Sequence, residues 1–267
     1  MSLVLVLILL ACLFGPPLLG GLTAGLLEYC QAKKEGRPLP SLLLPFPGFF
    51  AGLRQPAADR WALQWALLSL TLQVAAMCLL GLQRSLPSVL LFQAAGAWSL
   101  LLAAAIRPEA AGTPDVSRTI RSLLIQQPLL FLMAAGLFFA TGSFSLNNLS
   151  ETPRLLGIDL PLLWLVLLGV AQVSRDNAPA SSSPAGPVAA VMRLSQCYAS
   201  GCLLLLAGFF WTRSVAGAMV IAVVLLVAFS LLRFVRTPWL SKLANYWGYA
   251  FFASGLNLLW VYIKYWQ

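Results

Sequence analysis

Long apolar runs alternate with short polar connections along the whole chain, and this pattern predicts a bundle of transmembrane helices. A helix needs roughly 20 mostly apolar residues to cross the hydrocarbon core of a bilayer. Eight runs approach or exceed that length: Ser2 to Leu27, Trp61 to Gln83, Leu86 to Ile106, Thr119 to Leu146, Ile158 to Ser174, Pro187 to Trp211, Ser214 to Val235 and Leu240 to Tyr265. The runs are continuous rather than alternating at every second residue, which excludes the strands of a membrane β-barrel. The predicted fold is therefore an all-α integral membrane protein with about eight transmembrane helices.

Residues 28–60 form the longest predicted connection and contain a further apolar segment. This segment, Leu42 to Leu53 (LLLPFPGFFAGL), is too short and too rich in proline to span a membrane. Its Leu and Phe residues between basic flanks suit an element lying in the plane of the membrane interface. A re-entrant packing loop explains the pattern equally well. We expect one polytopic domain over residues 1–267, with this segment in its first cytoplasmic loop.

The composition agrees with a membrane protein and excludes an ordinary soluble domain. Hydrophobic residues make up 60% of the chain and charged residues only 9%, whereas soluble domains contain about 25% charged residues. The first apolar run has no basic residue before it, so it lacks the positive segment of a cleaved signal peptide. We expect that run to remain in the mature protein.

Basic residues are distributed unevenly between successive connections, and this predicts the orientation of the helices. Thirteen of the 17 Lys and Arg residues fall in the first, third, fifth and seventh connections. Because cytoplasmic loops carry the excess of Lys and Arg, these connections should be cytoplasmic and both termini should lie outside. The expected location is the cytoplasmic membrane of a bacterium or archaeon. The net charge of +9 then reflects loops that face anionic lipid or an acidic partner, and no nucleic-acid partner is expected.

The sequence contains no recognisable active site or metal site of its own. It has no His, and its five Cys residues include no C-x-x-C pair, so zinc and His-ligated haem are not expected. Walker and G-x-S-x-G motifs are absent as well, and the carboxylates lie in predicted loops or near helix ends. The predicted helices contain glutamines instead: Gln64, Gln73, Gln93, Gln126, Gln127, Gln172 and Gln196. Hydrogen bonding between helices explains them best, and a path for water or protons is the alternative.

Three stretches carry a family resemblance. They are the segment from Phe14 to Pro56, which includes GRPLPSLLLPFPGFFAGLRQP; RSLLIQQPLLFLMAAGLFFATGSFSL from Arg121 to Leu146; and LLGVAQVSRDNAPASSSPAGP from Leu167 to Pro187. In this order the chain resembles the membrane subunit that complex I shares with energy-converting NiFe hydrogenases and formate hydrogenlyases. The resemblance implies an eight-helix subunit that adjoins the quinone site in complex I and supports a hydrophilic arm. The short first loop looks closer to the hydrogenase branch.

Two departures from the family pattern remove titratable groups. The family usually has Glu-Pro where this chain has Gln127-Pro128, and glutamine cannot release a proton. The fifth connection keeps Arg175, Asp176 and Asn177, but ASSSPAGP follows where the family has an acidic run. These losses leave proton conduction open and make quinone binding unexpected.

The candidate site is therefore a subunit junction with a neighbouring polar path rather than a catalytic centre. Its members are Arg37, Arg54, Arg118, Arg121, Gln127, Arg175, Asp176, Asn177 and Arg193. The positive-inside bias alone accounts for the arginines. The more specific hypothesis is that Arg121 and Arg175 make charge-assisted hydrogen bonds at the junction with an electron-transfer subunit.

The resemblance implies a membrane-anchor subunit of a multisubunit redox complex. Its partners would be iron–sulfur and large hydrogenase-like or complex I-like subunits, antiporter-like membrane subunits and the lipid bilayer. This chain would hold no cofactor, and the Ni-Fe and iron–sulfur clusters would belong to the partners. A stand-alone transporter or channel and a non-pumping scaffold are the alternatives, although the two halves show no matched broken helices of the kind typical of transporters.

Overall fold

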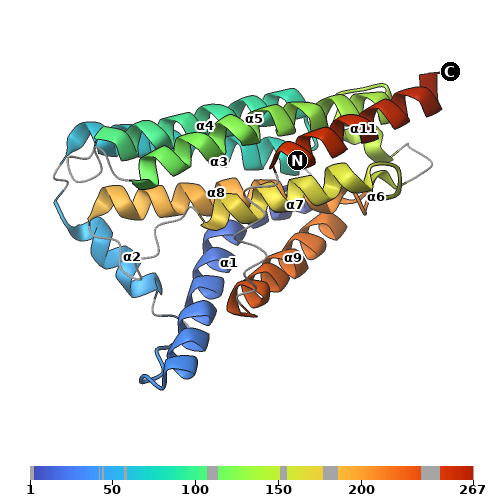
Figure 1. The fold of residues 1–267 in the computed structure, drawn as a ribbon. Coiled ribbons are helices and arrows are strands. Elements are labelled where there is room, and N and C mark those ends of the chain that lie inside the picture. The colour runs from blue at the N-terminus through green and yellow to red at the C-terminus, as the bar shows by residue number, and fades with distance from the viewer. Residues whose placement is uncertain are drawn as a thin grey trace.

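The chain folds into a helical bundle (Figure 1). A computed structural model describes residues 3–41, 43, 45–56, 59–106, 114–150, 155–176, 186–235 and 247–266. The elements are α1 (Leu3–Glu35), α2 (Pro45–Arg54), α3 (Arg60–Gly81), α4 (Leu86–Ile106), α5 (Pro114–Thr141), the 3-10 turn η1 (Leu146–Ser150), α6 (Leu156–Asp159), α7 (Pro161–Asp176), α8 (Pro187–Phe209), α9 (Val215–Val235) and α11 (Trp247–Trp266). Within these ranges there is no β-strand, only an isolated bridge between Ser85 and Ser145.

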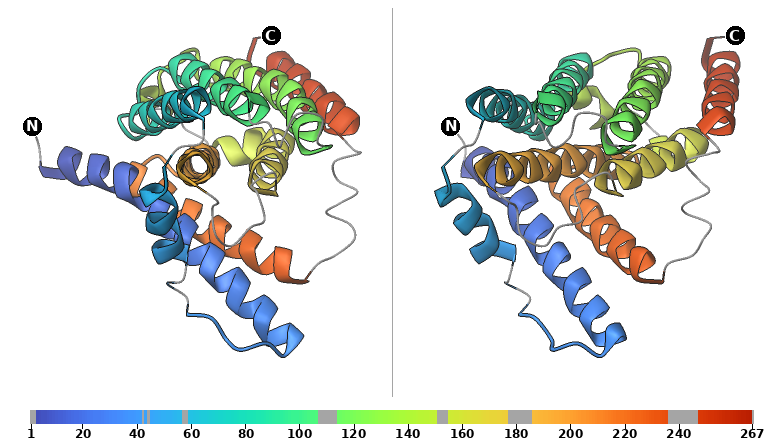
Figure 2. Two further views of the ribbon diagram at one scale, coloured as in Figure 1. Left: turned by 90° about the vertical axis from the view of Figure 1, so that its left-hand side faces the viewer. Right: turned by 60° about the vertical axis from the view of Figure 1, so that its left-hand side comes forward.

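Helix α8 lies at the centre of the bundle. Helices α3, α4, α5 and α11 form a row on one side of it, and α1, α2 and α9 lie on the other, as the view along α8 in Figure 2 shows. Helix α7 packs beside α8 and reaches both α5 and α11. The central position explains the composition of α8, because its residues Leu203 to Leu206 are all buried. A helix that is apolar all round suits such a position.

Local sequence signals fix several helix starts. Asp59 precedes α3, and its carboxylate accepts hydrogen bonds from the backbone N–H groups of Trp61 at 2.8 Å and Ala62 at 3.2 Å. This bonding satisfies two donors that the first helical turn leaves unpaired. Helix α8 begins with Pro187, whose missing N–H costs nothing at a first helical position. Gly186 before it has a φ of 91°, which a residue without a Cβ adopts readily.

The length and composition of the helices confirm a helical membrane protein. Four described helical segments are long and apolar enough to cross a bilayer: Leu3–Cys30, Arg60–Gly81, Leu86–Ile106 and Pro187–Phe209. Three shorter apolar segments accompany them in the described part, Gln126–Phe139, Pro161–Ala171 and Val215–Ala228. The count of eight spans remains a prediction.

Some helix boundaries differ from those that hydrophobicity predicts. Helix α1 continues past Leu27 to Glu35, because the Gln, Ala and Lys residues after Leu27 favour helix as strongly as the apolar ones. The run predicted from Ile158 is divided between α6 and α7, and α7 begins at Pro161. The interfacial or re-entrant segment contains the ten-residue helix α2, which packs on α8 and α1.

The second, fourth and sixth connections meet at one end of the bundle. The N–H of Leu86 donates to the carbonyl of Phe144 at 2.9 Å, and the N–H of Gly157 donates to the carbonyl of Phe210 at 2.7 Å. Near the C-terminus, Lys264 Nζ lies 3.1 Å from the Asp159 carboxylate at this same end. The described helix ends that flank the more basic odd-numbered connections therefore lie away from this end. Which end faces the cytoplasm remains the prediction from the charge distribution.

Candidate functional site

The structure describes the predicted junction residues unequally. Arg37, Arg54, Gln127 and Arg193 have described side chains. For four others only the helix position is described: Arg118 and Arg121 lie on α5, and Arg175 and Asp176 end α7. Asn177 lies outside the described residues. Contacts between Arg121, Arg175 and a partner therefore remain a prediction.

The basic residues of the first loop are exposed. Arg37 follows the end of α1 and forms an ion pair with Glu35, with 2.6 Å between the guanidinium and the carboxylate. An exposed pair of this kind contributes about 0–1 kcal/mol to stability. Its main consequence is that Glu35 offsets the positive charge of Arg37. Arg54 is the last residue of α2 and is also exposed. Arg54 lies near the start of α8, since the neighbouring Gln55 side chain approaches Gly186.

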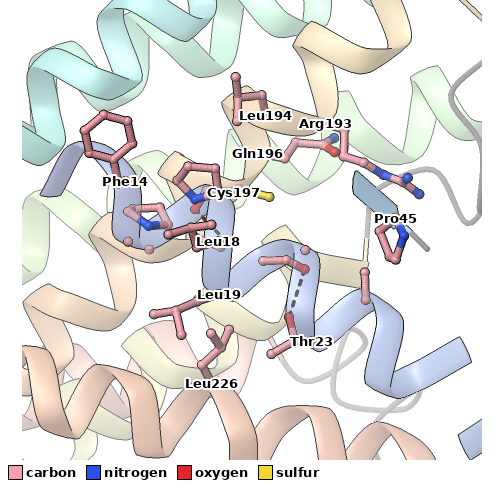
Figure 3. Close-up of a pocket in the computed structure, with 18 of the residues that line it drawn as sticks. Phe14, Leu18, Leu19, Thr23, Pro45, Arg193, Leu194, Gln196, Cys197 and Leu226 are labelled. Atoms are coloured by element: carbon pink, nitrogen blue, oxygen red, sulfur yellow. Dashed lines mark hydrogen bonds between the residues drawn. The ribbon is translucent and has the colours of Figure 1, made fainter. Parts of the chain in front are cut away.

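A cavity of about 790 Å³ lies between α1, α2, α8 and α9. This volume is within the range of about 300–1,000 Å³ found for small-molecule sites. The walls are mainly apolar and small side chains, and Arg193 reaches the cavity from α8 (Figure 3). Arg193 is half-buried, whereas Arg37 and Arg54 are exposed.

Glycines allow the helices around the cavity to approach closely. A Cβ on Gly20 would lie 2.6 Å from Cys197 Sγ, and one on Gly21 would lie 2.5 Å from the ring of Phe46. Gly201 on α8 faces Pro16 on α1 in the same way, at 3.2 Å. These contacts attach α1 to both α8 and α2. Small residues serve this purpose at helix interfaces in membranes, where backbones must come close.

Charged groups gather at one end of the cavity. Arg193, Arg37 and Glu28 are its charged lining residues. Because Gly20 meets Cys197 and Pro16 meets Gly201, α1 and α8 run antiparallel, and Glu28 therefore lies toward the Arg193 end. Figure 3 shows Arg193 near Pro45, with Leu226 and Phe14 away from it.

A polar seam joins α3, α4 and α8 inside the bundle. Ser69 Oγ donates to the carbonyl of Gly96 at 2.7 Å and lies 2.7 Å from Ser195 Oγ. One turn further along, Gln73 Nε2 donates to the carbonyl of Gln93 at 3.0 Å, and Gln93 Nε2 donates to the carbonyl of Ala199 at 3.1 Å. We name these side chains, Ser69, Gln73, Gln93 and Ser195, the polar seam. It links three helices whose apolar surfaces alone would not set their register.

Two amide oxygens of the polar seam have no hydrogen-bond donor within the described protein. They are Oε1 of Gln73 and Oε1 of Gln93, and nearby Gln196 shares this property. Gly96 provides the space for the Gln73 amide, because a Cβ there would lie 2.6 Å from Gln73 Nε2. Unpaired buried acceptors are costly, so they mark the places where water would bind most favourably. Both earlier interpretations of the glutamines, helix linkage and a hydrated path, stay open.

A double-mutant cycle on Ser69→Ala and Ser195→Ala should give a small coupling energy. We expect about 0.6 kcal/mol and no more than about 2 kcal/mol, because hydrogen bonds between membrane helices are weaker than their burial suggests. Thermal unfolding of the purified chain in detergent measures it. Thr71→Ala is the matched control, because Thr71 Oγ1 bonds only within its own helix in the described contacts. Additive effects of the two serine substitutions would contradict the pairing.

The structure turns Gln126, rather than Gln127, into the interior. Gln126 is buried, and its Nε2 donates to the carbonyl of Val170 on α7 at 3.3 Å. Gln127 is only partly buried. Successive residues on a helix point about 100° apart. Gln127, at the position of the family's Glu, and Gln126, which links α5 to α7, therefore lie on different faces of α5.

The sequence interpretation omitted the cavity and the serines of the polar seam. Small and polar residues mark helix interfaces in membranes. The sequence signals for these features were therefore the adjacent Gly20 and Gly21, and Ser195 beside Gln196. Among the described residues, no group of three or more His, Cys, Asp or Glu is placed to hold a metal ion.

Comparison with known proteins identifies a fold. No family model matches the chain, and no curated protein matches it. Among solved structures it is similar to a chain of the membrane-bound sulfane sulfur reductase, an archaeal respiratory membrane complex, with a TM-score of 0.65 and 14% identity. The likeness is one of fold. It covers 96% of this chain and 99% of that chain, so the entire arrangement of helices is shared rather than one pair or triplet.

Proposed function

We propose that this chain is the membrane-anchor subunit of a multisubunit redox complex of the complex I-like or NiFe hydrogenase type. It would dock the hydrophilic electron-transfer arm and link that arm to ion-translocating subunits. The observation that carries the proposal is the shared fold over almost the full length of both chains. A chance resemblance between helical bundles would more readily involve a few helices than the whole course of the chain.

The distribution of charge supports a docking role. The odd-numbered connections contain thirteen of the 17 basic residues, and the described helix ends beside them lie away from the end closed by the Leu86–Phe144 and Gly157–Phe210 hydrogen bonds. Helix α2 packs at the basic end and finishes at Arg54. A basic, membrane-apposed surface would attract the acidic edge of a peripheral subunit as well as anionic lipid.

The partners would hold the redox cofactors. We infer that iron–sulfur and large hydrogenase-like subunits carry the iron–sulfur and Ni-Fe clusters and that antiporter-like membrane subunits lie alongside. In this arrangement the present chain contributes position and rigidity. Glycine contacts around α1 and the buried run of α8 would keep the docking surface fixed relative to the membrane.

A non-pumping scaffold is the second candidate, and the buried polar residues favour it. In the described part of the chain these are Thr23, Ser69, Gln73, Gln93, Ser99, Gln126, Ser195, Ser200, Ser254 and Asn257. None of them can ionise near neutral pH, whereas proton-moving membrane proteins keep ionisable groups in their interiors. On this variant, ion movement in the complex would run through sister subunits.

Affinity purification in mild detergent from cells that carry the tagged full chain tests the proposal. We expect iron–sulfur and large hydrogenase-like subunits to co-purify, and we expect R121A and R175A to lower their recovery because both arginines lie at the basic end. R84A is the matched control, since Arg84 lies in the second connection at the opposite end. A chain that purifies alone and transports a solute in liposomes would overturn the proposal. Unchanged recovery and activity in R121A and R175A would remove those residues from the junction.

A further inference from the structure

One face of α8 lines the cavity over a length that corresponds to a single leaflet of the bilayer. The lining residues on this helix run from Arg193 to Leu205 and include Cys197, Gly201 and Leu204. At 1.5 Å per residue this stretch measures about 18 Å. Half of a hydrocarbon core of about 30 Å is roughly 15 Å. Along α8 the lining begins about 9 Å from the helix start at Pro187 and passes the middle of the helix.

The polarity of the lining changes along that length. The charged lining groups, the guanidiniums of Arg193 and Arg37 and the carboxylate of Glu28, lie at the surface end, and Arg37 also pairs with Glu35. Leu19 and Leu226 lie deeper, away from Arg193 (Figure 3). A ligand that fits this gradient has an anionic head and a long apolar tail.

The cavity is open sideways, toward the region that lipid would occupy. Phe14 and Leu18 on α1 both line it, yet they are 55% and 52% exposed. Side chains that are apolar, exposed and beside a cavity provide a lateral entrance from a membrane rather than from water. Helix α2 lies across the charged end, where Pro45 and Phe46 contribute to the lining.

We propose that this cavity binds one membrane phospholipid, with its phosphate at Arg193 and Arg37 and one acyl chain between α1, α8 and α9. Arginine is suited to a phosphate because its planar guanidinium donates two parallel hydrogen bonds. The acyl chain fills space that would otherwise separate α1 from the bundle. The lipid thus serves as a structural element of the surface on which α2 rests.

Lipid binding to the purified full chain tests this assignment. After delipidation, deuterated phosphatidylglycerol and the diacylglycerol with the same acyl chains are added separately, and native mass spectrometry counts what remains bound. We expect one phosphatidylglycerol per chain and a preference of about tenfold over diacylglycerol, the size of one charge-assisted hydrogen bond. Arg193→Ala should abolish the preference, and Arg193→Lys should restore part of it.

A second pair of variants tests the tail site independently of the charge. Leu18→Trp should exclude both lipids by filling the entrance, and it is expected to fold because Leu18 is exposed. Leu10→Trp is the control, since Leu10 is similarly exposed on α1 but does not line the cavity. Three results would overturn the proposal: equal retention of the two lipids, unchanged binding in both Arg193→Ala and Leu18→Trp, or an isoprenoid quinone or a partner's helix in place of phospholipid in the native complex.

Discussion

Replacing Gly208 by Ala should force α8 and α9 apart and lower the melting midpoint of the purified chain by about 4–8 °C. A Cβ at this position would lie 2.4 Å from the carbonyl oxygen of Ala218 and 2.9 Å from its Cα. Both atoms belong to the backbone of α9, so no rotamer change can relieve the overlap. Overpacking of this kind costs about 1–3 kcal/mol.

Gly255→Ala is the matched control for this substitution. Gly255 also lies in a helix, α11, but no described residue of another element lies within 4 Å of a Cβ built there. Since Ala stabilises a helix by about 1 kcal/mol relative to Gly, this variant should melt at the same temperature or slightly higher. The two substitutions are chemically identical, and their effects should have opposite signs. Equal melting midpoints would show that α9 does not pack against Gly208 as the structure indicates.

Hydrophobicity could predict most of the helices because bilayer thickness sets their minimum length. The run from Leu86 to Ile106 coincides with α4, and Pro187 begins both the predicted segment and α8. The end of α1 could not be predicted in this way. Residues after Leu27 become polar but still favour helix, so apolar length and helix length differ there.

The cavity could not be predicted from the sequence, because no local pattern of residues encodes it. Its walls come from α1, α2, α8 and α9, which are distant along the chain and meet only in the folded bundle. Arg193 illustrates the difficulty: the positive-inside bias accounted for it fully, and only the fold places it at the charged end of an apolar cavity. The choice between Gln126 and Gln127 likewise depended on helix rotation, which a nearly uniform apolar sequence does not specify.

Exchanging Gln73 for Glu should be far more damaging than exchanging it for Leu. Gln73 is 1% exposed, and its amide donates to the Gln93 carbonyl while its own oxygen has no donor within the described protein. An ionised Glu side chain would remove that donor and carry a charge into the bundle, at a cost of about 2.5–3.5 kcal/mol. Leucine removes the unpaired oxygen together with the donor, so the loss should stay within about 1 kcal/mol.

Which of the two variants melts at the lower temperature also distinguishes the two interpretations of the polar seam. If the seam only links α3, α4 and α8, Gln73→Leu should melt close to the unaltered chain and Gln73→Glu should melt well below it. If the seam is a hydrated path, Gln73→Leu should melt below Gln73→Glu. Water would solvate the carboxylate, whereas leucine would displace the water and leave Gln93 Oε1 unpaired. Thermal scans of both variants in detergent decide between them. If Gln73→Glu melts lower, ion movement in the complex would be assigned to other subunits. If Gln73→Leu melts lower, this chain would hold a water-filled path along a polar seam that contains no acid.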